Sequence, residues 1–263
     1  PWYKRWLRGE FASDHLVLER VDAMEGEGFW RALAEHLARV EPDERDAVVF
    51  LHGYNVTFEG AALRAAQIGF DLKIHAMAFF SWPSRGRVAD YTTDEATIQA
   101  SEAHIVAFLR EVCRSSGAER VHIIAHSMGN RGLLRSFQRI LATAREGEDL
   151  RFGQIVLAAP DVDADLFRDL ARRLPERADQ VTLYVSSKDR AVGMSEWVHD
   201  FDRAGFAPPV VVVDGIDTIH VEGFDLLSLG HSYFAEAAGV LHDMYDLLRH
   251  GSKPRTRPRL DPQ

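Results

Sequence analysis

At 263 residues, the chain is long enough to form one large domain with a full hydrophobic core. Its composition, 46% hydrophobic and 27% charged, is ordinary for a globular protein. The net charge of −9 argues against binding to nucleic acid or to an anionic membrane surface. The single cysteine, Cys113, rules out an internal disulfide, and its helical pattern predicts a small core residue.

Short apolar runs alternate along the chain with amphipathic helical patterns. Buried strands are predicted at residues 47–51, 74–80, 121–125, 154–159, 181–186 and 209–213. The helical patterns between them include a long helix over 94–115 and a last helix from 232. This alternation predicts an α/β fold, with a mostly parallel central sheet and helices on both faces. No long insertion follows residue 159, so we expect a minimal cap.

Three segments are expected. Residues 1–45, which begin with several aromatic side chains, are predicted to pack on the body of the protein. Residues 46–250 form the α/β domain, and the Pro- and Arg-rich residues 251–263 are predicted to be a disordered tail. No apolar run reaches roughly 18 residues, so no membrane-spanning helix is expected. We expect a cytoplasmic protein, although the chain starts without methionine and an exported or anchored form stays open.

The stretch Ala125-His126-Ser127-Met128-Gly129 joins the predicted strand at 121–125 to an amphipathic helix. A serine between a strand and a helix, with small residues two positions away on each side, is typical of the nucleophile elbow G-x-S-x-G. Alanine replaces the first glycine here, which is a mild departure. The alternative is that Ser127 caps the helix. The strand before it and the helix after it favour a catalytic nucleophile.

Functional groups of such sheets gather at the carboxyl ends of the strands. His52-Gly53-Tyr54-Asn55 follows the strand at 47–51, and the second oxyanion donor of this architecture comes from that loop. We therefore predict that the backbone N–H groups of Tyr54 and Met128 form the oxyanion hole. His52 precedes the serine in the chain, so it is interpreted as a histidine that orients the loop by a hydrogen bond.

The acid and the base of a triad are sought after the serine, in the order serine, acid, histidine. Asp189 follows the strand at 181–186 and is the predicted acid, with Asp161, one strand earlier, as its rival. His231 lies beside a glycine before the last helix and is the predicted base. His220, flanked by apolar residues, is interpreted as part of an extended segment.

Metal and nucleotide sites are not indicated by the sequence. His122 and His126 lie four residues apart on a predicted strand, where about 13 Å separates them, too far for one ion. The chain has no H-E-x-x-H, no paired cysteines, no G-x-x-x-x-G-K-[ST] and no G-x-G-x-x-G. We expect no cofactor and no metal.

Five stretches in a fixed order resemble a bacterial α/β-hydrolase family of unknown function, number 900 among the domains of unknown function. These stretches are residues 49–58, 80–84, 125–130, 158–161 and 229–234. The resemblance covers roughly residues 45 to 250. It implies an α/β-hydrolase fold, supports Ser127 and His231 as triad members and favours Asp189 as the acid. It implies no substrate.

These observations predict a serine hydrolase that cleaves a small carboxylic ester through an acyl-enzyme. Tyr54, Asn55 and Trp82 are the candidate substrate contacts, with core packing as the alternative for the aromatic side chains. The same triad serves amidases and thioesterases, and a non-catalytic binding protein of this fold is a further alternative. No nucleic-acid partner and no integral membrane segment are expected, and the sequence leaves the oligomeric state open.

Overall fold

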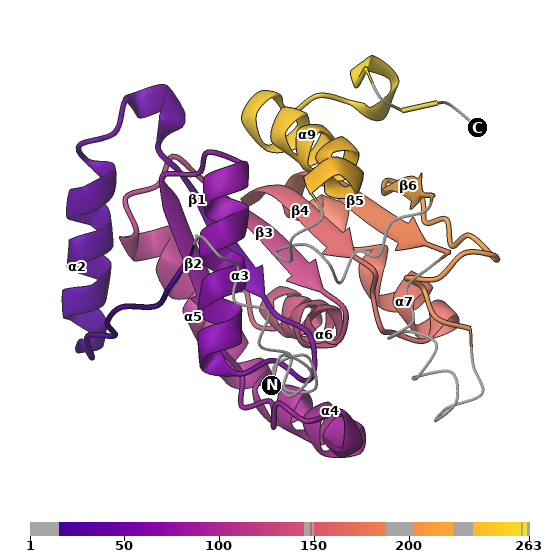
Figure 1. Ribbon diagram of the computed structural model, residues 1–263, viewed down its shortest axis with the longest axis horizontal. Helices are drawn as coiled ribbons and strands as arrows, with labels where there is room; N and C mark the ends of the chain where they lie inside the picture. Colours follow the sequence, from indigo (N-terminus) through magenta and orange to yellow (C-terminus); the bar gives the residue numbers. More distant parts are fainter. Residues whose placement is uncertain are drawn as a thin grey trace, which may run out of the picture.

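The computed structural model describes residues 16–144, 148, 150–187, 202–222, 234–258 and 260–261. Six parallel strands form one sheet in the order β2-β1-β3-β4-β5-β6 (Figure 1). They are β1 (Asp46–Leu51), β2 (Ala76–Phe80), β3 (Arg120–His126), β4 (Phe152–Ala158), β5 (Ala178–Ser186) and β6 (Asp217–Val221). The chain passes from β1 outward to β2 and then returns to the other side of β1 for β3. Ligands of open α/β sheets bind where the strand order reverses in this way.

The central strands are buried on both faces because alternate residues enter two different cores. Val49 and Leu51 of β1 belong to one core, and Val48 and Phe50 to the other. The first core lies under α4 (Tyr91–Ala100), α5 (Glu102–Ser115), α6 (Gly129–Ala142) and α7 (Ala164–Ala171). The second lies under α3 (Phe58–Asp71) and α9 (Phe234–His250). This two-sided burial explains why the strands are continuous apolar runs in the sequence.

The described part of the N-terminal segment packs at the β2 edge of the sheet (Figure 1). Its helix α2 (Gly26–Leu37) buries Leu37 against Ala47 and Ala76. The Trp30 ring lies 5.6 Å from the ring of Phe108 on α5. A short 3-10 helix, η1 (Pro42–Glu44), leads from α2 to β1, and residues 1–15 lie outside the described residues.

Two predicted elements differ in the structure. The long helix predicted over 94–115 is divided into α4 and α5 at Ser101, whose hydroxyl donates to the Thr97 carbonyl at 2.8 Å. The strand predicted at 209–213 is absent, and the edge strand is β6 instead. Val212 is 69% exposed, so the run of valines that suggested a strand is only half buried. Other 3-10 turns are η2 (Val88–Asp90), η3 (Leu174–Glu176) and η5 (Pro254–Thr256).

The C-terminal segment corrects the prediction of a disordered tail for residues 251–258. This part includes η5, and Arg257 is buried with its Nη1 donating to Asp243 Oδ2 on α9 at 2.7 Å. The Tyr184 hydroxyl from β5 donates to the same carboxylate oxygen at 2.5 Å. A buried ion pair therefore holds this segment against α9 and the sheet. Composition alone does not reveal that Arg257 has Asp243 as its partner.

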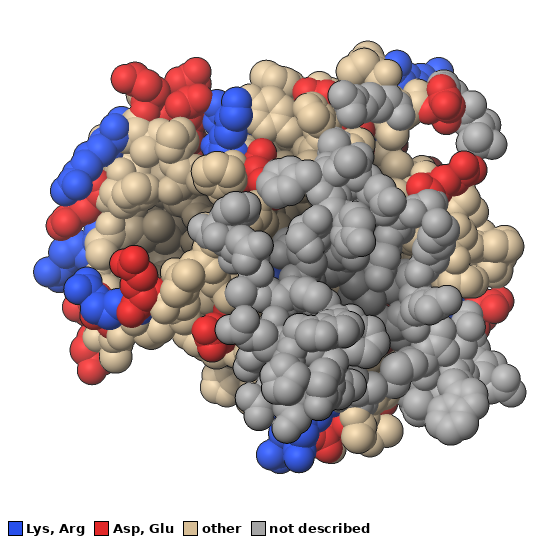
Figure 2. All heavy atoms as spheres, viewed as in Figure 1, with Lys and Arg blue, Asp and Glu red and all other residues tan. Residues whose placement is uncertain are grey.

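The described surface carries charges of both signs. On the face drawn in Figure 2, Lys and Arg side chains are interspersed with Asp and Glu. Of the helices in the described ranges, none has both the length and the apolar character needed to cross a membrane.

Candidate active site

Ser127 occupies a strained turn between β3 and α6. Its φ of +50° is in the left-handed region, which costs a residue with a side chain roughly 1–2 kcal/mol. The Ser127 N–H donates to the Ala158 carbonyl at 3.0 Å. Asn130 Nδ2 donates to the carbonyls of Ala125, Ser127 and Ala158 at 3.0 to 3.3 Å. The turn is thus held from two strands at once, as a strained conformation requires.

The alternative interpretation of Ser127 as a helix cap is not supported. The helix α6 begins at Gly129, and its N-cap residue is Met128. Ser127 is 3% exposed, so its hydroxyl is shielded from bulk water. A Cβ on Gly129 would lie 2.6 Å from the Leu51 carbonyl oxygen, closer than real Cβ atoms approach. Gly129, two positions after the serine, therefore lets the start of α6 lie against the end of β1.

The loop after β1 lies directly against the serine. A Cβ on Gly53 would be 3.0 Å from Ser127 Cβ and 3.2 Å from His126 Nδ1. His52 Nδ1 donates to the Gly53 carbonyl at 2.8 Å, so this nitrogen carries the proton. Trp82 Nε1 donates to the His52 carbonyl at 2.9 Å, and the two rings stack with centroids 5.0 Å apart. The predicted loop-orienting hydrogen bond of His52 is therefore present.

The two histidines beside the serine are kept neutral by burial. Desolvation lowers the pKa of His52 to about 4 and that of His126 to about 3. The positive charge of Arg64 lowers both pKa values further. A general base works best with a pKa near the working pH, so neither imidazole fits that role at neutral pH.

These two histidines are expected to make the protein less stable in mild acid. In the unfolded chain they bind a proton as the pH falls below about 6.5, whereas in the folded chain they stay neutral until the pH nears their lowered pKa values. The free energy of unfolding should therefore fall by about 1.6 kcal/mol per imidazole between pH 6.5 and pH 5. Urea unfolding measured across this range checks the slope.

The control for this pH dependence is a set of single variants. His126→Gln and His52→Gln should each remove one imidazole's share of the slope, and His104→Gln, at an exposed position on α5, should leave the slope as it is. Equal slopes in all four proteins would show that the buried imidazoles do not cause the acid sensitivity.

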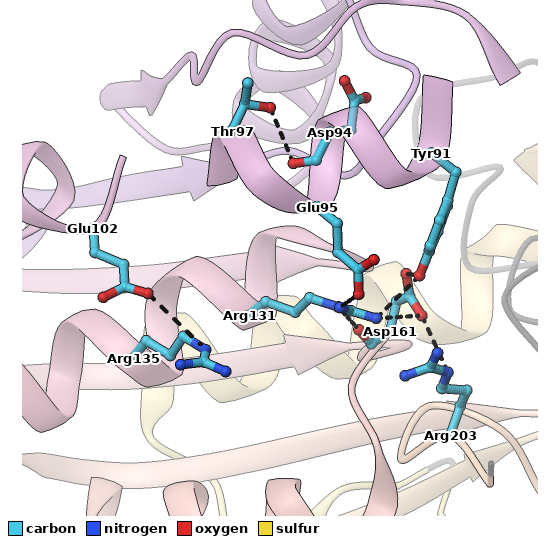
Figure 3. Close-up of polar contacts among 9 residues, drawn as sticks. All are labelled: Tyr91, Asp94, Glu95, Thr97, Glu102, Arg131, Arg135, Asp161 and Arg203. Atoms are coloured by element: carbon cyan, nitrogen blue, oxygen red, sulfur yellow. Dashed lines mark hydrogen bonds and ion pairs between the residues drawn. The ribbon is translucent and has the colours of Figure 1, made fainter. Parts of the chain in front are cut away.

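Asp161, the rival acid, is bound in a network of its own (Figure 3). The Tyr91 hydroxyl donates to Asp161 Oδ2 at 2.6 Å, and Arg203 Nε lies 3.5 Å from Oδ1. Arg131 Nε donates to the Asp161 carbonyl at 2.5 Å. The Asp161 N–H donates to the Ser127 carbonyl at 3.3 Å. Asp161 therefore braces the elbow through its backbone, and its carboxylate balances two guanidinium groups.

The remaining predicted residues lie as follows. Asp189 and His231 are outside the described residues. Met128 is fully buried, and the Tyr54 ring meets the Tyr91 ring edge-on with centroids 5.2 Å apart. Trp82 is 1% exposed, and its contacts given above are to the loop that it supports. The structure thus brings Ser127, Met128 and the loop of Tyr54 together.

Sequence reasoning missed a buried carboxylate that organises two loops. Asp94 on α4 is fully buried and accepts from the Asn55 N–H at 3.2 Å, from the Ser84 hydroxyl at 2.6 Å and from the Arg85 N–H at 2.8 Å. Asn55 has a φ of +56°, so this contact fixes a strained residue next to Tyr54. In the sequence, Asp94 had only the signal of an acidic residue in a helix's first turn.

The structural neighbours are remote in sequence. A predicted CIB-like hydrolase from Thermoplasma acidophilum has a TM-score of 0.46 and 17% identity, covering 80% of this chain and 89% of that chain. An esterase from Pyrobaculum calidifontis has a TM-score of 0.48 and 9% identity, covering 78% and 76%. A lipase-esterase related protein from Clostridium acetobutylicum has a TM-score of 0.47 and 11% identity, covering 78% and 96%.

Sequence comparison finds a curated relative and a family match. The relative, uncharacterized protein alr1448 from Nostoc sp. strain PCC 7120, is 26% identical over 129 residues. The match covers 39% of this chain and 34% of the relative, so the chain spans about a third of that relative's length. The family match covers residues 30–249, from α2 to the end of α9. With its parallel sheet, covering helices and serine elbow, the chain belongs to the family described as alpha/beta hydrolase of unknown function (DUF900).

Proposed function

We propose that this protein is a serine hydrolase that cleaves a carboxylic ester through an acyl-enzyme. The observation that carries the proposal is the conformation of Ser127, with a φ of +50° between β3 and α6 and the Gly53 loop packed against it. Backbone strain of this kind collects at catalytic sites, where the surroundings over-determine it. Membership of an α/β-hydrolase family supports hydrolysis as the reaction class.

In the proposed mechanism, His231 takes the proton from the Ser127 hydroxyl as the oxygen attacks the acyl carbon, and Asp189 holds the imidazole in the correct tautomer. The oxyanion accepts hydrogen bonds from the N–H groups of Tyr54 and Met128. His231 returns the proton to the leaving alcohol, then deprotonates the water that releases the acid. Asp189 and His231 are assigned by chain order and by the family resemblance.

Substrate contact is proposed for the loop after β1, through the side chain of Tyr54, whose N–H is the oxyanion donor, and that of Asn55, which follows it. Trp82 donates a hydrogen bond to the His52 carbonyl, so it would act on the substrate by positioning this loop. Buried, hydrogen-bonded neighbours of this kind keep catalytic groups within a fraction of an ångström of their productive positions.

Labelling with a fluorophosphonate probe, followed by peptide mass spectrometry, tests the proposal. We expect one adduct per chain, on Ser127, and none on the Ser127→Ala variant. Equimolar ester, thioester and amide substrates with the same acyl group then compare the three bond types, and we expect the ester to react fastest. Absence of an adduct on folded protein, together with no turnover of any of the three, would favour a non-catalytic binding protein.

Crowding the oxyanion loop should slow the reaction without unfolding the protein. In Gly53→Ala the added methyl would stand 3.0 Å from Ser127 Cβ, so the loop must move away from the serine. The shift needed is a few tenths of an ångström, and a displacement of this size is expected to lower kcat/KM about tenfold. Steady-state kinetics measure the loss, and a thermal melt follows the fold.

The matched control for this glycine is Gly26→Ala, because a Cβ at Gly26 meets nothing within 4 Å. It should leave kcat/KM unchanged. An unaltered kcat/KM in Gly53→Ala as well would contradict the placement of the oxyanion donor in this loop.

A further inference from the structure

A pocket of about 230 Å³ lies between α4, α6 and α7, beside the Asp161 network. It is smaller than the roughly 300–1,000 Å³ of pockets for drug-sized ligands, so it suits a small molecule. Part of its lining is polar and includes Gln99, Arg131 and Arg135. The lining also has an apolar part, which includes Val162, Leu166 and Leu170. A ligand that fills it needs one polar and one apolar end.

Arg203 also lines this pocket, and its guanidinium has N–H groups that make no hydrogen bond within the described residues. The residue is 4% exposed, and its Nε and Nη2 have no hydrogen-bond acceptor in the part of the chain that the structure describes. Asp161 Oδ1 lies 3.5 Å from Arg203 Nε, which is an ion pair without a hydrogen bond. A buried donor without an acceptor costs about 1–3 kcal/mol, and more where the group is charged. A ligand oxygen would remove that cost.

The neighbouring groups fix the charge that the pocket accepts. Arg131 is committed, since it pairs with Glu95 and with Asp161. Arg135 at the rim is half exposed, and its Nε is 4.0 Å from Glu102 (Figure 3). Two guanidinium groups, Arg203 and Arg135, are thus only loosely paired. Glu95 and Asp163 also line the pocket, so a single negative charge fits better than a phosphate dianion.

We propose that this pocket binds a small monocarboxylate, whose oxygens accept hydrogen bonds from Arg203 and whose hydrocarbon part packs against α7. A carboxylate matches the fork of guanidinium donors, and a charge-assisted pair is about twice as strong as a neutral hydrogen bond. The residues that line the pocket do not include Ser127 or the loop after β1. The site is therefore separate from the proposed catalytic centre and does not depend on its chemistry.

Calorimetric titration with acetate, butyrate, hexanoate and benzoate, each beside its uncharged amide, tests the proposal. At least one carboxylate should bind saturably below about 10 mM, and its amide about tenfold more weakly or worse. Arg203→Gln should weaken the carboxylate about tenfold or more. Failure of all four acids to saturate would overturn the proposal.

A rim variant keeps the test decisive if Arg203→Gln does not fold. Gln99 is exposed at the mouth, so Gln99→Glu should weaken carboxylate binding about three- to tenfold by charge repulsion. Arg172→Glu, an exposed change at the residue just after α7 and outside the lining, is the charge control and should bind as the parent does. Binding that ignores Gln99→Glu but protects Ser127 from a fluorophosphonate would place the acid at the serine instead and overturn the proposal.

Discussion

Replacing Asp189 with asparagine is expected to lower kcat for a short ester about 10⁴-fold while the fold and its stability stay as in the parent. The asparagine amide can donate an N–H to His231, which favours the wrong tautomer of the imidazole. It also lacks the negative charge that stabilises the protonated imidazole. Steady-state hydrolysis of a chromogenic short-chain ester, paired with a thermal melt, measures both effects.

The rival acid provides the contrast. Asp161 balances Arg131 and Arg203 in a buried network, so Asp161→Asn should act mainly on stability, by about 3–5 kcal/mol. Tyr91→Phe, which removes only the hydroxyl that donates to Asp161, is the milder control and should keep kcat within a few-fold of the parent. If folded Asp161→Asn were inactive and Asp189→Asn were as active as the parent, the acid would follow β4 and not β5.

The elbow could be read from the sequence because its causes are local. A buried strand must be apolar, a helix must show its period, and a serine at the junction needs small neighbours. Each of these signals lies within residues 121–141. That the Gly53 loop and Ser127 share one edge of the sheet follows from the same rules, since parallel strands present their carboxyl ends there, whereas the pairing of β1 with β3 comes from the structure.

The polar network around the elbow could not be read in this way. Asp161 meets Tyr91, 70 residues away, and Arg131, 30 residues away. Charged residues at such separations pair only after the helices have packed, and their sequence pattern is that of ordinary solvent-exposed helices. The edge strand β6 was indicated only by the extended segment around His220, which β6 contains, and the reason is related. An edge strand is paired on one side alone, so it is short and partly polar, whereas the apolar run at 209–213 offered the stronger but misleading pattern.

The C-terminal segment shows most clearly where a prediction from composition is wrong. Proline and arginine enrichment predicts disorder because such residues bury little apolar surface. One arginine overrides this average, since Arg257 finds Asp243 fourteen residues earlier in the chain and becomes fully buried. Composition describes the mean tendency of a segment and carries no information about a single specific partner.

Removing the charge of Arg257 is expected to be the most destabilising single change in the C-terminal segment. In Arg257→Met, Asp243 keeps its carboxylate in a site where burial already raises its pKa, without the guanidinium that balances it. Breaking one side of a buried pair costs about 3–5 kcal/mol. The midpoint of urea unfolding, read at constant slope, measures the loss.

Two further variants show that the ion pair itself is responsible. Arg255 is exposed two residues earlier, so Arg255→Met makes the same chemical change on the surface and should move the free energy of unfolding by less than about 0.5 kcal/mol. Adding Asp243→Asn to Arg257→Met removes the uncompensated charge and should restore much of the stability, because an unpaired buried charge costs more than a missing pair. If the single and double variants lose equal free energy of unfolding, the effect comes from packing of the long side chain. If Arg257→Met is as stable as the parent, the ion pair does not anchor the C-terminal segment.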